Sequence, residues 1–241
     1  MSRFFVPEGS VTGGRITVTG EELHHAKDVM RLREGDLITV FDGTGREYTG
    51  VVDRVGKDEL SAAVSRVSEA GKERCRLTLV QAIPKLSRMD LIIEKATELG
   101  VARIIPIVTS RTVVKISGEG NKTERWKKIA VVAAKQCGRS TFPEIAPVTG
   151  LEDSLKEVKG CEISLMPCLH EGNKRLRDAI CGRKAESAAV FIGPEGDFTR
   201  EEVEAAIRSG VIPVILGNEV LRSETAAVAV LSVLSYELRW K

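Results

Sequence analysis

The sequence lacks the features that mark membrane and secreted proteins. No apolar run reaches the ~20 residues that a membrane-spanning helix needs, and the longest, residues 226–234, is about half that length. The first ten residues, MSRFFVPEGS, lack the apolar core and cleavage site of a signal peptide. These absences predict a cytoplasmic protein with no membrane partner.

Cysteine and histidine are scarce and badly spaced for a metal site. The five cysteines are odd in number and contain no C-x-x-C pair, so neither a disulfide framework nor a structural zinc site is expected. His24 and His25 are adjacent in the sequence, so they would not share one face of a helix. We therefore expect no metal and a reducing compartment.

Three common catalytic or nucleotide-binding motifs are also missing. The chain has no G-x-x-x-x-G-K-[ST] phosphate loop, no G-x-G-x-x-G after the first strand of a βαβ unit, and no G-x-S-x-G nucleophile elbow. P-loop nucleotide hydrolysis, dinucleotide binding of the common type and serine hydrolysis are therefore disfavoured.

The composition is that of an ordinary globular protein, with 42% hydrophobic and 29% charged residues. Net charge is only +2, but residues 73–140 carry 14 Lys and Arg against 6 Asp and Glu. A basic middle segment indicates either a polyanionic partner or the solvated faces of helices. Charge alone leaves both readings open.

Residues 1–72 have the pattern of a small, mostly antiparallel β-barrel. Short strand-like runs, RFFV, RITV, LITVFD, REYTGVVDRV and ELSAAVSRV, are separated by glycine-containing turns. One helix interrupts them, with Thr19 and Glu22 spaced as a capping box. Residues 68–75 are polar and broken by glycine, so we place a domain boundary there.

Residues 73–241 alternate between strands and helices. Apolar strands are expected at LTLVQAI, VARIIPIV, EISLM, SAAVFI and VIPVIL. One helix covers 87–99 before Gly100, and another begins at Thr123, stops at Gly138 and turns Val132 inward. This alternation predicts a parallel sheet covered by helices on both faces.

Two of these strands end in glycine-containing loops, Gly193-Pro194-Glu195-Gly196 and Leu216-Gly217-Asn218-Glu219. Ligands of open α/β sheets bind at the carboxyl ends of the strands, and glycine lets the backbone approach a ligand closely. A helix follows each loop, the first with a Thr199–Glu202 capping box and the second, almost all apolar and expected to be buried, from about Ser223. The loops indicate one shared pocket or, alternatively, simple turns.

Four stretches, QAIPKLSRMDLIIEKATELGV, KIAVVAAKQCGR, FIGPEGDFTREEV and ILGNEVLRSETAAVAVL, resemble the motifs of the RsmE family, the 16S rRNA uridine-N3 methyltransferases of the SPOUT superfamily. HHAKDVMRLREGD and VFDGTGREY resemble that family's N-terminal domain. The resemblance implies a PUA-like, RNA-binding β-barrel over 1–72 and a SPOUT α/β methyltransferase domain with a C-terminal trefoil knot over 73–241. It also implies a homodimer with its cofactor, S-adenosylmethionine, near the subunit interface.

Carried over residue by residue, the resemblance implies the following cofactor-binding residues: Leu165, Met166, Ile192, Gly193, Glu195, Gly196, Leu216, Gly217, Val220, Leu221 and Thr225. The sequence departs from the family's pattern twice. Asp197 stands where a second glycine is usual, and Asn218-Glu219 stands where a Pro-Arg type pair is common.

For catalysis, Arg222 is our first candidate, because a guanidinium can stabilise the charge that develops on the uridine oxygens. Glu195 is a candidate base or an orienter of Arg222, with capping of the next helix as its alternative role. Contacts to rRNA phosphates are expected from the following residues: Arg31, Arg33, Lys85, Arg88 and Arg139.

The function expected from the resemblance is methylation of uridine N3 in 16S rRNA within the small ribosomal subunit. Two alternatives remain at this point: a SPOUT methyltransferase with another RNA target, and a non-catalytic RNA-binding relative. The intact glycine loops disfavour the second alternative.

Overall fold

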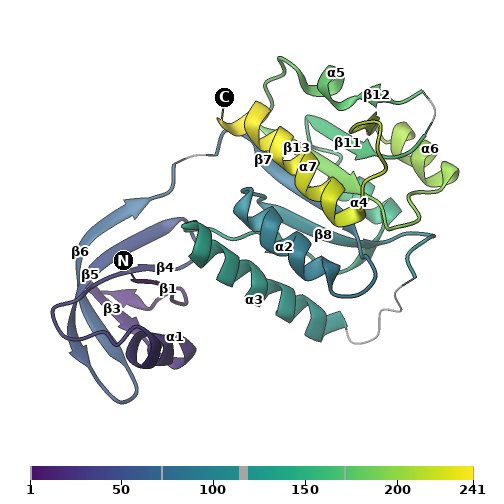
Figure 1. Cartoon of the computed structure of the whole chain (residues 1–241). Helices are drawn as coiled ribbons and strands as arrows, with labels where there is room; N and C mark the ends of the chain where they lie inside the picture. Colours follow the sequence, from purple (N-terminus) through teal and green to yellow (C-terminus); the bar gives the residue numbers. More distant parts are fainter. Residues whose placement is uncertain (1, 72, 114–118, 171, 241) are drawn as a thin grey trace. The chain divides into compact units, whose positions relative to one another are not determined.

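The computed structural model describes residues 2–71, 73–113, 119–170 and 172–240 (Figure 1), and the side chains of 119–121 are not described. The chain forms two compact units. The smaller comprises Met1–Lys72 and Ala134–Phe142, and the larger comprises Glu73–Ala133 and Pro143–Lys241. The smaller unit thus includes residues 134–142, which the sequence pattern places in the second domain.

The smaller unit is built on one six-stranded sheet with the order β1-β4-β5-β6-β3-β2. The strands are β1 (Ser2–Phe5), β2 (Val11–Thr12), β3 (Arg15–Val18), β4 (Leu37–Phe41), β5 (Arg46–Val55) and β6 (Leu60–Glu69). All pairs are antiparallel except β1–β4, which agrees with the mostly antiparallel pairing that the sequence predicts. Phe4, Ile16, Ile38 and Leu60 are fully buried in its core.

The helix of the smaller unit differs from its prediction. It runs as α1 (Gly20–His24) and continues as a π-helical turn over His25–Val29. Thr19 is its N-cap residue, but the Thr19 side chain makes no capping hydrogen bond. The Glu22 carboxylate instead accepts a hydrogen bond from Lys135 Nζ at 2.6 Å, so the predicted capping box does not form.

The larger unit contains one parallel eight-stranded sheet, as predicted. Its order is β10-β8-β7-β13-β11-β14-β12, with β9 paired to β8. The strands are β7 (Arg76–Ala82), β8 (Arg103–Val108), β9 (Glu144–Ile145), β10 (Thr149–Gly150), β11 (Ile163–Pro167), β12 (Lys174–Arg175), β13 (Ser187–Ile192) and β14 (Ile212–Ile215). The three two-residue strands, β9, β10 and β12, are too short to be read from the sequence.

Helices cover both faces of this sheet. α4 (Leu151–Glu157) and α6 (Arg200–Arg208) pack on one face, in a buried cluster that includes Ile105, Met166 and Phe191. α2 (Arg88–Glu98) and α7 (Ser223–Ser235) lie together on the other face (Figure 1). The remaining helices are α3 (Glu119–Cys137), α5 (Leu176–Ile180) and a π-helical turn, Tyr236–Trp240.

The helix starts and ends predicted from the sequence are partly confirmed. Gly100 follows α2 at φ +83°, which ends the helix as expected. The capping box of α6 forms, with Thr199 and Glu202 bonded in both directions. α3, however, begins at Glu119 rather than Thr123, and Val132 is 64% exposed because the buried face of α3 passes through Trp126, Ala130 and Ala133.

α7 begins at Ser223 as predicted, but it is not buried all round. Ala227, Val230, Leu231 and Leu234 are buried, whereas Val233 is 40% exposed. In the part of the chain that the structure describes, no helix is both long and apolar enough to cross a membrane. The trefoil knot stays a prediction; the strand order shows only that β11 lies between β13 and β14.

Candidate cofactor pocket

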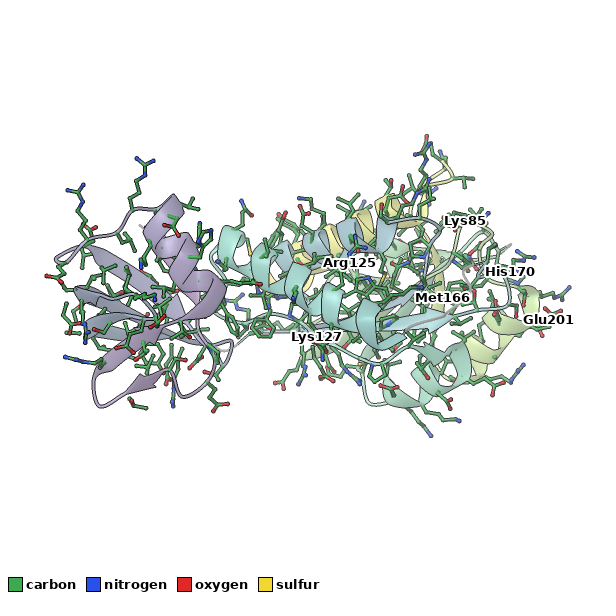
Figure 2. All side chains as sticks on the ribbon, turned by 90° about the horizontal axis from the view of Figure 1, so that it is seen from below. Lys85, Arg125, Lys127, Met166, His170 and Glu201 are labelled. Carbon is green, nitrogen blue, oxygen red and sulfur yellow. The ribbon has the colours of Figure 1, made fainter. Side chains whose placement is uncertain are left out.

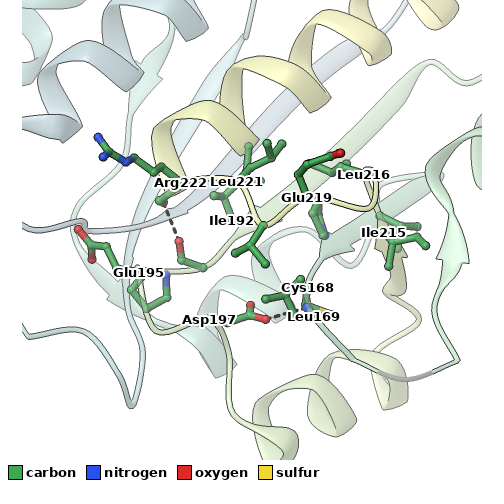
Figure 3. Close-up of a pocket in the computed structure, with 18 residues that line it drawn as sticks. Cys168, Leu169, Ile192, Glu195, Asp197, Ile215, Leu216, Glu219, Leu221 and Arg222 are labelled. Carbon is green, nitrogen blue, oxygen red and sulfur yellow. Dashed lines mark hydrogen bonds between the residues drawn. The ribbon is translucent and has the colours of Figure 1, made fainter.

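The pocket lies where the carboxyl ends of β11, β13 and β14 meet (Figure 3). Because the strands are parallel, the loops that follow them emerge at the same edge of the sheet. These loops enclose a volume of about 250 Å³. The lining residues are Pro167, Cys168, Leu169, Ile192, Gly193, Pro194, Glu195, Asp197, Val214, Ile215, Leu216, Gly217, Glu219, Val220, Leu221, Arg222, Ser223 and Ala226.

The loop after β13, residues 193–198, is held by its neighbours; we call it the β13 loop. Three successive residues of it hydrogen-bond to loops that follow three different strands. The contacts are Lys85 N to Glu195 Oε1 at 2.9 Å, Arg111 Nη1 to Gly196 O at 2.6 Å, and Leu169 N to Asp197 Oδ2 at 2.7 Å. The ends of β7, β8 and β11 therefore fix the shape of the β13 loop from three sides.

A buried chain of two hydrogen bonds also supports the β13 loop. Gln81, fully buried on β7, donates from Nε2 to Ser223 Oγ at 3.0 Å. Ser223 Oγ donates in turn to the carbonyl of Gly193 at 2.7 Å. These hydrogen bonds join the start of α7 to the β13 loop, and they could not be predicted from the sequence because the residues are far apart along the chain.

Gly193 is required by packing as much as by any ligand. A Cβ at this position would lie 3.2 Å from the Phe198 ring and 3.3 Å from Asp197 Oδ1. Gly217 has no such neighbour, since its Cβ would meet only Glu219 Oε2 at 3.5 Å. The two glycines, which look equivalent in the sequence, therefore have different physical roles.

Glu195 and Arg88 contact each other rather than their expected partners. Arg88 Nη1 lies 3.5 Å from carboxylate oxygens of both Glu195 and Glu224. Among the described residues, Glu195 has no contact with Arg222, so the geometry gives no support to its expected role in orienting Arg222. Glu195 does not cap α6 either, because Thr199 fills that role.

Arg222 stands at the other side of the pocket, on the loop after β14. This β14 loop, residues 216–222, is largely exposed, and its Val220 side chain is 74% exposed. Arg222 is the N-cap residue of α7 and lines the pocket. Among the residues that the structure describes, the Arg222 guanidinium has no hydrogen-bond or ion-pair partner, so it is available to a ligand or substrate.

Most of the expected cofactor residues line the pocket. These are Ile192, Gly193, Glu195, Leu216, Gly217, Val220 and Leu221. Leu165 and Met166 are fully buried in β11, Gly196 faces Arg111, and Thr225 is exposed on the first turn of α7. Sequence reasoning missed Cys168, Leu169 and Asp197, although their position just after two predicted strands could have marked them.

Cys168 is a pocket residue that stays uncharged. Burial raises the pKa of its thiol to about 11, and the nearby negative charge of Asp197 adds to the increase. The thiolate is the nucleophilic form of cysteine, so the neutral Cys168 is a weak nucleophile at neutral pH. Cys168 can therefore line a pocket for an electrophilic ligand without reacting with it.

The charges around the pocket favour a cationic ligand. Three carboxylates, those of Glu195, Asp197 and Glu219, stand against the single guanidinium of Arg222. Such a lining disfavours a polyphosphate, which needs positive charge or a nest of backbone N–H groups. In the described ranges, no three or more His, Cys, Asp or Glu side chains are grouped to hold a metal ion.

The residues expected to contact RNA are distributed over both units. Lys85 lies at the end of the larger unit that also carries His170 (Figure 2), next to the β13 loop. Arg31, Arg33 and Arg139 belong to the smaller unit, where Arg31 has a left-handed backbone with φ 54° and Arg139 Nη2 contacts Thr141 Oγ1 at 3.2 Å.

Comparison with known proteins identifies the family. Residues 71–235 match the model of an RNA methyltransferase domain, and residues 18–65 match an RNA methyltransferase PUA domain. A ribosomal RNA small subunit methyltransferase E from Bacillus subtilis is 33% identical over 229 residues, covering 92% of this chain and 90% of that protein. The chain belongs to the ribosomal RNA small subunit methyltransferase E family.

Solved structures of similar proteins agree with this membership. A methyltransferase from Legionella pneumophila, solved with bound SAM, is 34% identical with a TM-score of 0.87, covering 97% of this chain and 96% of the other. The family member from Neisseria gonorrhoeae, bound to S-adenosyl methionine, is 28% identical with a TM-score of 0.87, covering 99% and 98%. The α/β methyltransferase domain with an N-terminal PUA domain is thereby confirmed.

Proposed function

We propose that this protein uses S-adenosylmethionine to methylate N3 of a uridine in 16S rRNA, within the small ribosomal subunit. The observation that carries the proposal is the pocket at the carboxyl ends of β11, β13 and β14, in a chain that belongs to this methyltransferase family. The neighbours solved with S-adenosylmethionine support the choice of cofactor.

The pocket suits S-adenosylmethionine chemically. Its apolar lining, which includes Ile192, Leu216 and Leu221, would suit a flat adenine ring, and its glycines would let backbone groups approach adenine and ribose closely. The surplus of carboxylates complements a molecule that carries a sulfonium and an ammonium group. When bound, the cofactor supplies an electrophilic methyl group.

Arg222 is the residue that we assign to transition-state stabilisation. Uridine N3 carries a proton and becomes nucleophilic when the proton leaves, which puts negative charge on the neighbouring oxygens. A guanidinium held at the pocket, with no hydrogen-bond or ion-pair partner among the described residues, can stabilise that charge. Glu195, bonded to Lys85 N and close to Arg88, is better suited to hold the loop than to move a proton.

Substrate binding is assigned to the basic side chains outside the pocket. Lys85 extends from the loop after β7, beside the β13 loop, and its side chain has no ion-pair partner among the described residues. Arg31, Arg33 and Arg139 would extend the RNA contact over the smaller unit. Arg88 contributes less to phosphate binding than its charge suggests, because two carboxylates already neutralise it.

The test is a methylation assay with small ribosomal subunits from a strain that lacks the enzyme. We expect one methyl group per particle, mapped by mass spectrometry of the 16S rRNA to N3 of a single uridine. Methylation of a ribose, of another base or of no residue at all would contradict the proposed function.

We also propose that the protein is a homodimer with the pocket near the interface. Val220, Val233 and Tyr236 are 74%, 40% and 56% exposed, which leaves apolar surface along α7 and the β14 loop uncovered. Val233→Arg should yield a monomer in light scattering at micromolar concentration. Val132→Arg, at an exposed position of α3, is the control and should leave the wild-type mass unchanged; a monomeric wild type would contradict the dimer.

A further inference from the structure

Asp197 occupies an unfavourable backbone conformation for its residue type. Its φ is +61°, in the left-handed region that favours glycine, and the family resemblance also places glycine at this position. Aspartate tolerates this region better than most residues because its short side chain can accept a local hydrogen bond. Asp197 Oδ1 does so, accepting from Phe198 N at 2.8 Å.

The second carboxylate oxygen of Asp197 is bonded to another strand end. Asp197 Oδ2 accepts a hydrogen bond from Leu169 N at 2.7 Å (Figure 3). Leu169 lies two residues beyond β11, so no strand pairing holds its N–H, and its side chain is 65% exposed at the pocket. The preceding residue, Cys168, is held from the other side, since its N–H donates to the carbonyl of Val214 at 3.1 Å.

The end of β11 is thus held between β14 and the β13 loop, and Asp197 provides the second of these connections. A glycine at 197 would adopt the same backbone with less strain but would leave Leu169 N without this acceptor. Asp197 also packs against Gly193, whose Cβ position lies 3.3 Å from Asp197 Oδ1. One side chain therefore connects two of the three loops that form the pocket.

We propose that Asp197 is a positioning residue, whose carboxylate fixes the end of β11 against the β13 loop and so shapes the pocket before S-adenosylmethionine binds. The identity of the ligand rests on the proposed function, whereas the connection itself does not. In this protein the Asp197 carboxylate gives the pocket a defined wall, where a glycine would leave the backbone more conformational freedom.

The experiment compares Asp197→Gly and Asp197→Asn with the wild type. Asp197→Gly should weaken S-adenosylmethionine binding in calorimetry by about tenfold, equivalent to about 1.4 kcal/mol. Asp197→Asn, which tolerates the same backbone and retains one carbonyl oxygen as acceptor, should lie between the two. Methylation should show a raised KM for S-adenosylmethionine with kcat within about twofold of wild type, since loss of uniform binding leaves kcat unchanged.

A readout without ligand tests the connection directly. In hydrogen–deuterium exchange followed by mass spectrometry, the peptide that contains Leu169 should exchange faster in Asp197→Gly than in the wild type. The matched control is Glu162→Ala, because Glu162 Oε1 accepts from Glu186 N at 3.3 Å and so connects the amino ends of the same two strands, β11 and β13. This variant should leave both S-adenosylmethionine affinity and exchange at Leu169 unchanged.

The outcomes separate the two proposals. A folded wild type that does not bind S-adenosylmethionine would contradict the proposed function, while exchange at Leu169 would still test the connection. If the wild type binds and Asp197→Gly binds equally well, the positioning role is wrong, whether or not exchange at Leu169 changes. Weaker binding in Glu162→Ala as well would reduce the effect to general loosening of the sheet and would also overturn the inference.

Discussion

The β13 loop and the β14 loop look alike in the sequence and differ in the structure. Each follows a short apolar strand, contains glycine and precedes a helix. The β13 loop is bonded to the ends of β7, β8 and β11. Among the described residues, by contrast, no hydrogen bond or ion pair joins the side chains of residues 216–222 to another loop.

This difference assigns the two walls of the pocket different functions. A loop held by several hydrogen bonds keeps its shape without ligand, so binding costs it little conformational entropy. A loop with few contacts is ordered by whatever it binds, which here would be the cofactor, the RNA or a second subunit. The β13 loop is therefore the fixed wall, and the β14 loop, which carries Arg222, is the adjustable one.

Loss of Arg222 should give the largest effect on the reaction. Arg222→Ala should lower kcat by roughly 100-fold or more if the guanidinium stabilises the transition state. Stability should hardly change, because Arg222 has no partner in the described structure to lose. The measurement is single-turnover methylation of saturating small subunits, with Arg208→Ala, at an exposed position of α6, as control. A wild-type rate for Arg222→Ala would refute its catalytic role.

Valine substitutions at the two glycines test the comparison directly. A Cβ in Gly193→Val would lie 3.2 Å from the Phe198 ring and 3.3 Å from Asp197 Oδ1, and overpacking of this kind lowers folding stability by ~1–3 kcal/mol. Because these residues form the β13 loop, cofactor affinity should fall as well. A Cβ at Gly217 meets nothing closer than 3.5 Å, and Gly217→Val should leave the thermal unfolding midpoint unchanged.

Calorimetry and thermal unfolding of both variants provide the measurements. Gly160→Val is the control, because a Cβ there has no neighbour within 4 Å and Gly160 is not in a left-handed conformation. Equal loss of stability in Gly193→Val and Gly217→Val would mean that the two loops are not fixed to different degrees.

The sequence predicts the long elements well because each has its own periodicity. β5 and β13 begin and end where their alternating and apolar runs do, and α7 starts at Ser223. The short strands and the bonded partners of Asp197, Glu195 and Arg88 could not be read, because they depend on contacts between residues far apart in the chain. Glu22 shows the same limit: its local spacing predicts a capping box, but Lys135 is the stronger partner.

Alanine substitutions at Arg88 and Lys85 should distinguish a residue that supports the β13 loop from one that binds RNA. Arg88→Ala leaves Glu224, whose side chain is 14% exposed, without its cation, and should destabilise the protein by about 1–3 kcal/mol. Lys85→Ala should leave stability unchanged but reduce the salt dependence of RNA binding, by a slope of about 0.7 to 0.9. Urea unfolding and binding to small subunits at several salt concentrations would test this; the reverse pattern would contradict it.

The smallest expected effect is the response of the buried thiols to alkaline pH. Burial raises the pKa of Cys168 and of Cys75 from 9.0 to about 11 in the folded protein. Between these two values the unfolded chain releases protons that the folded chain keeps, so the stability present below pH 9 is lost as the pH rises toward 11. The loss should be on the order of 1 kcal/mol for each thiol. Urea unfolding at pH 8 and pH 10 measures it. Cys168→Ala should remove its share of the pH dependence. Because Cys168 lines the pocket beside the fixed wall, added S-adenosylmethionine should protect its thiol from iodoacetamide. Rapid labelling of Cys168 at pH 8 without ligand would show that this side of the pocket opens readily.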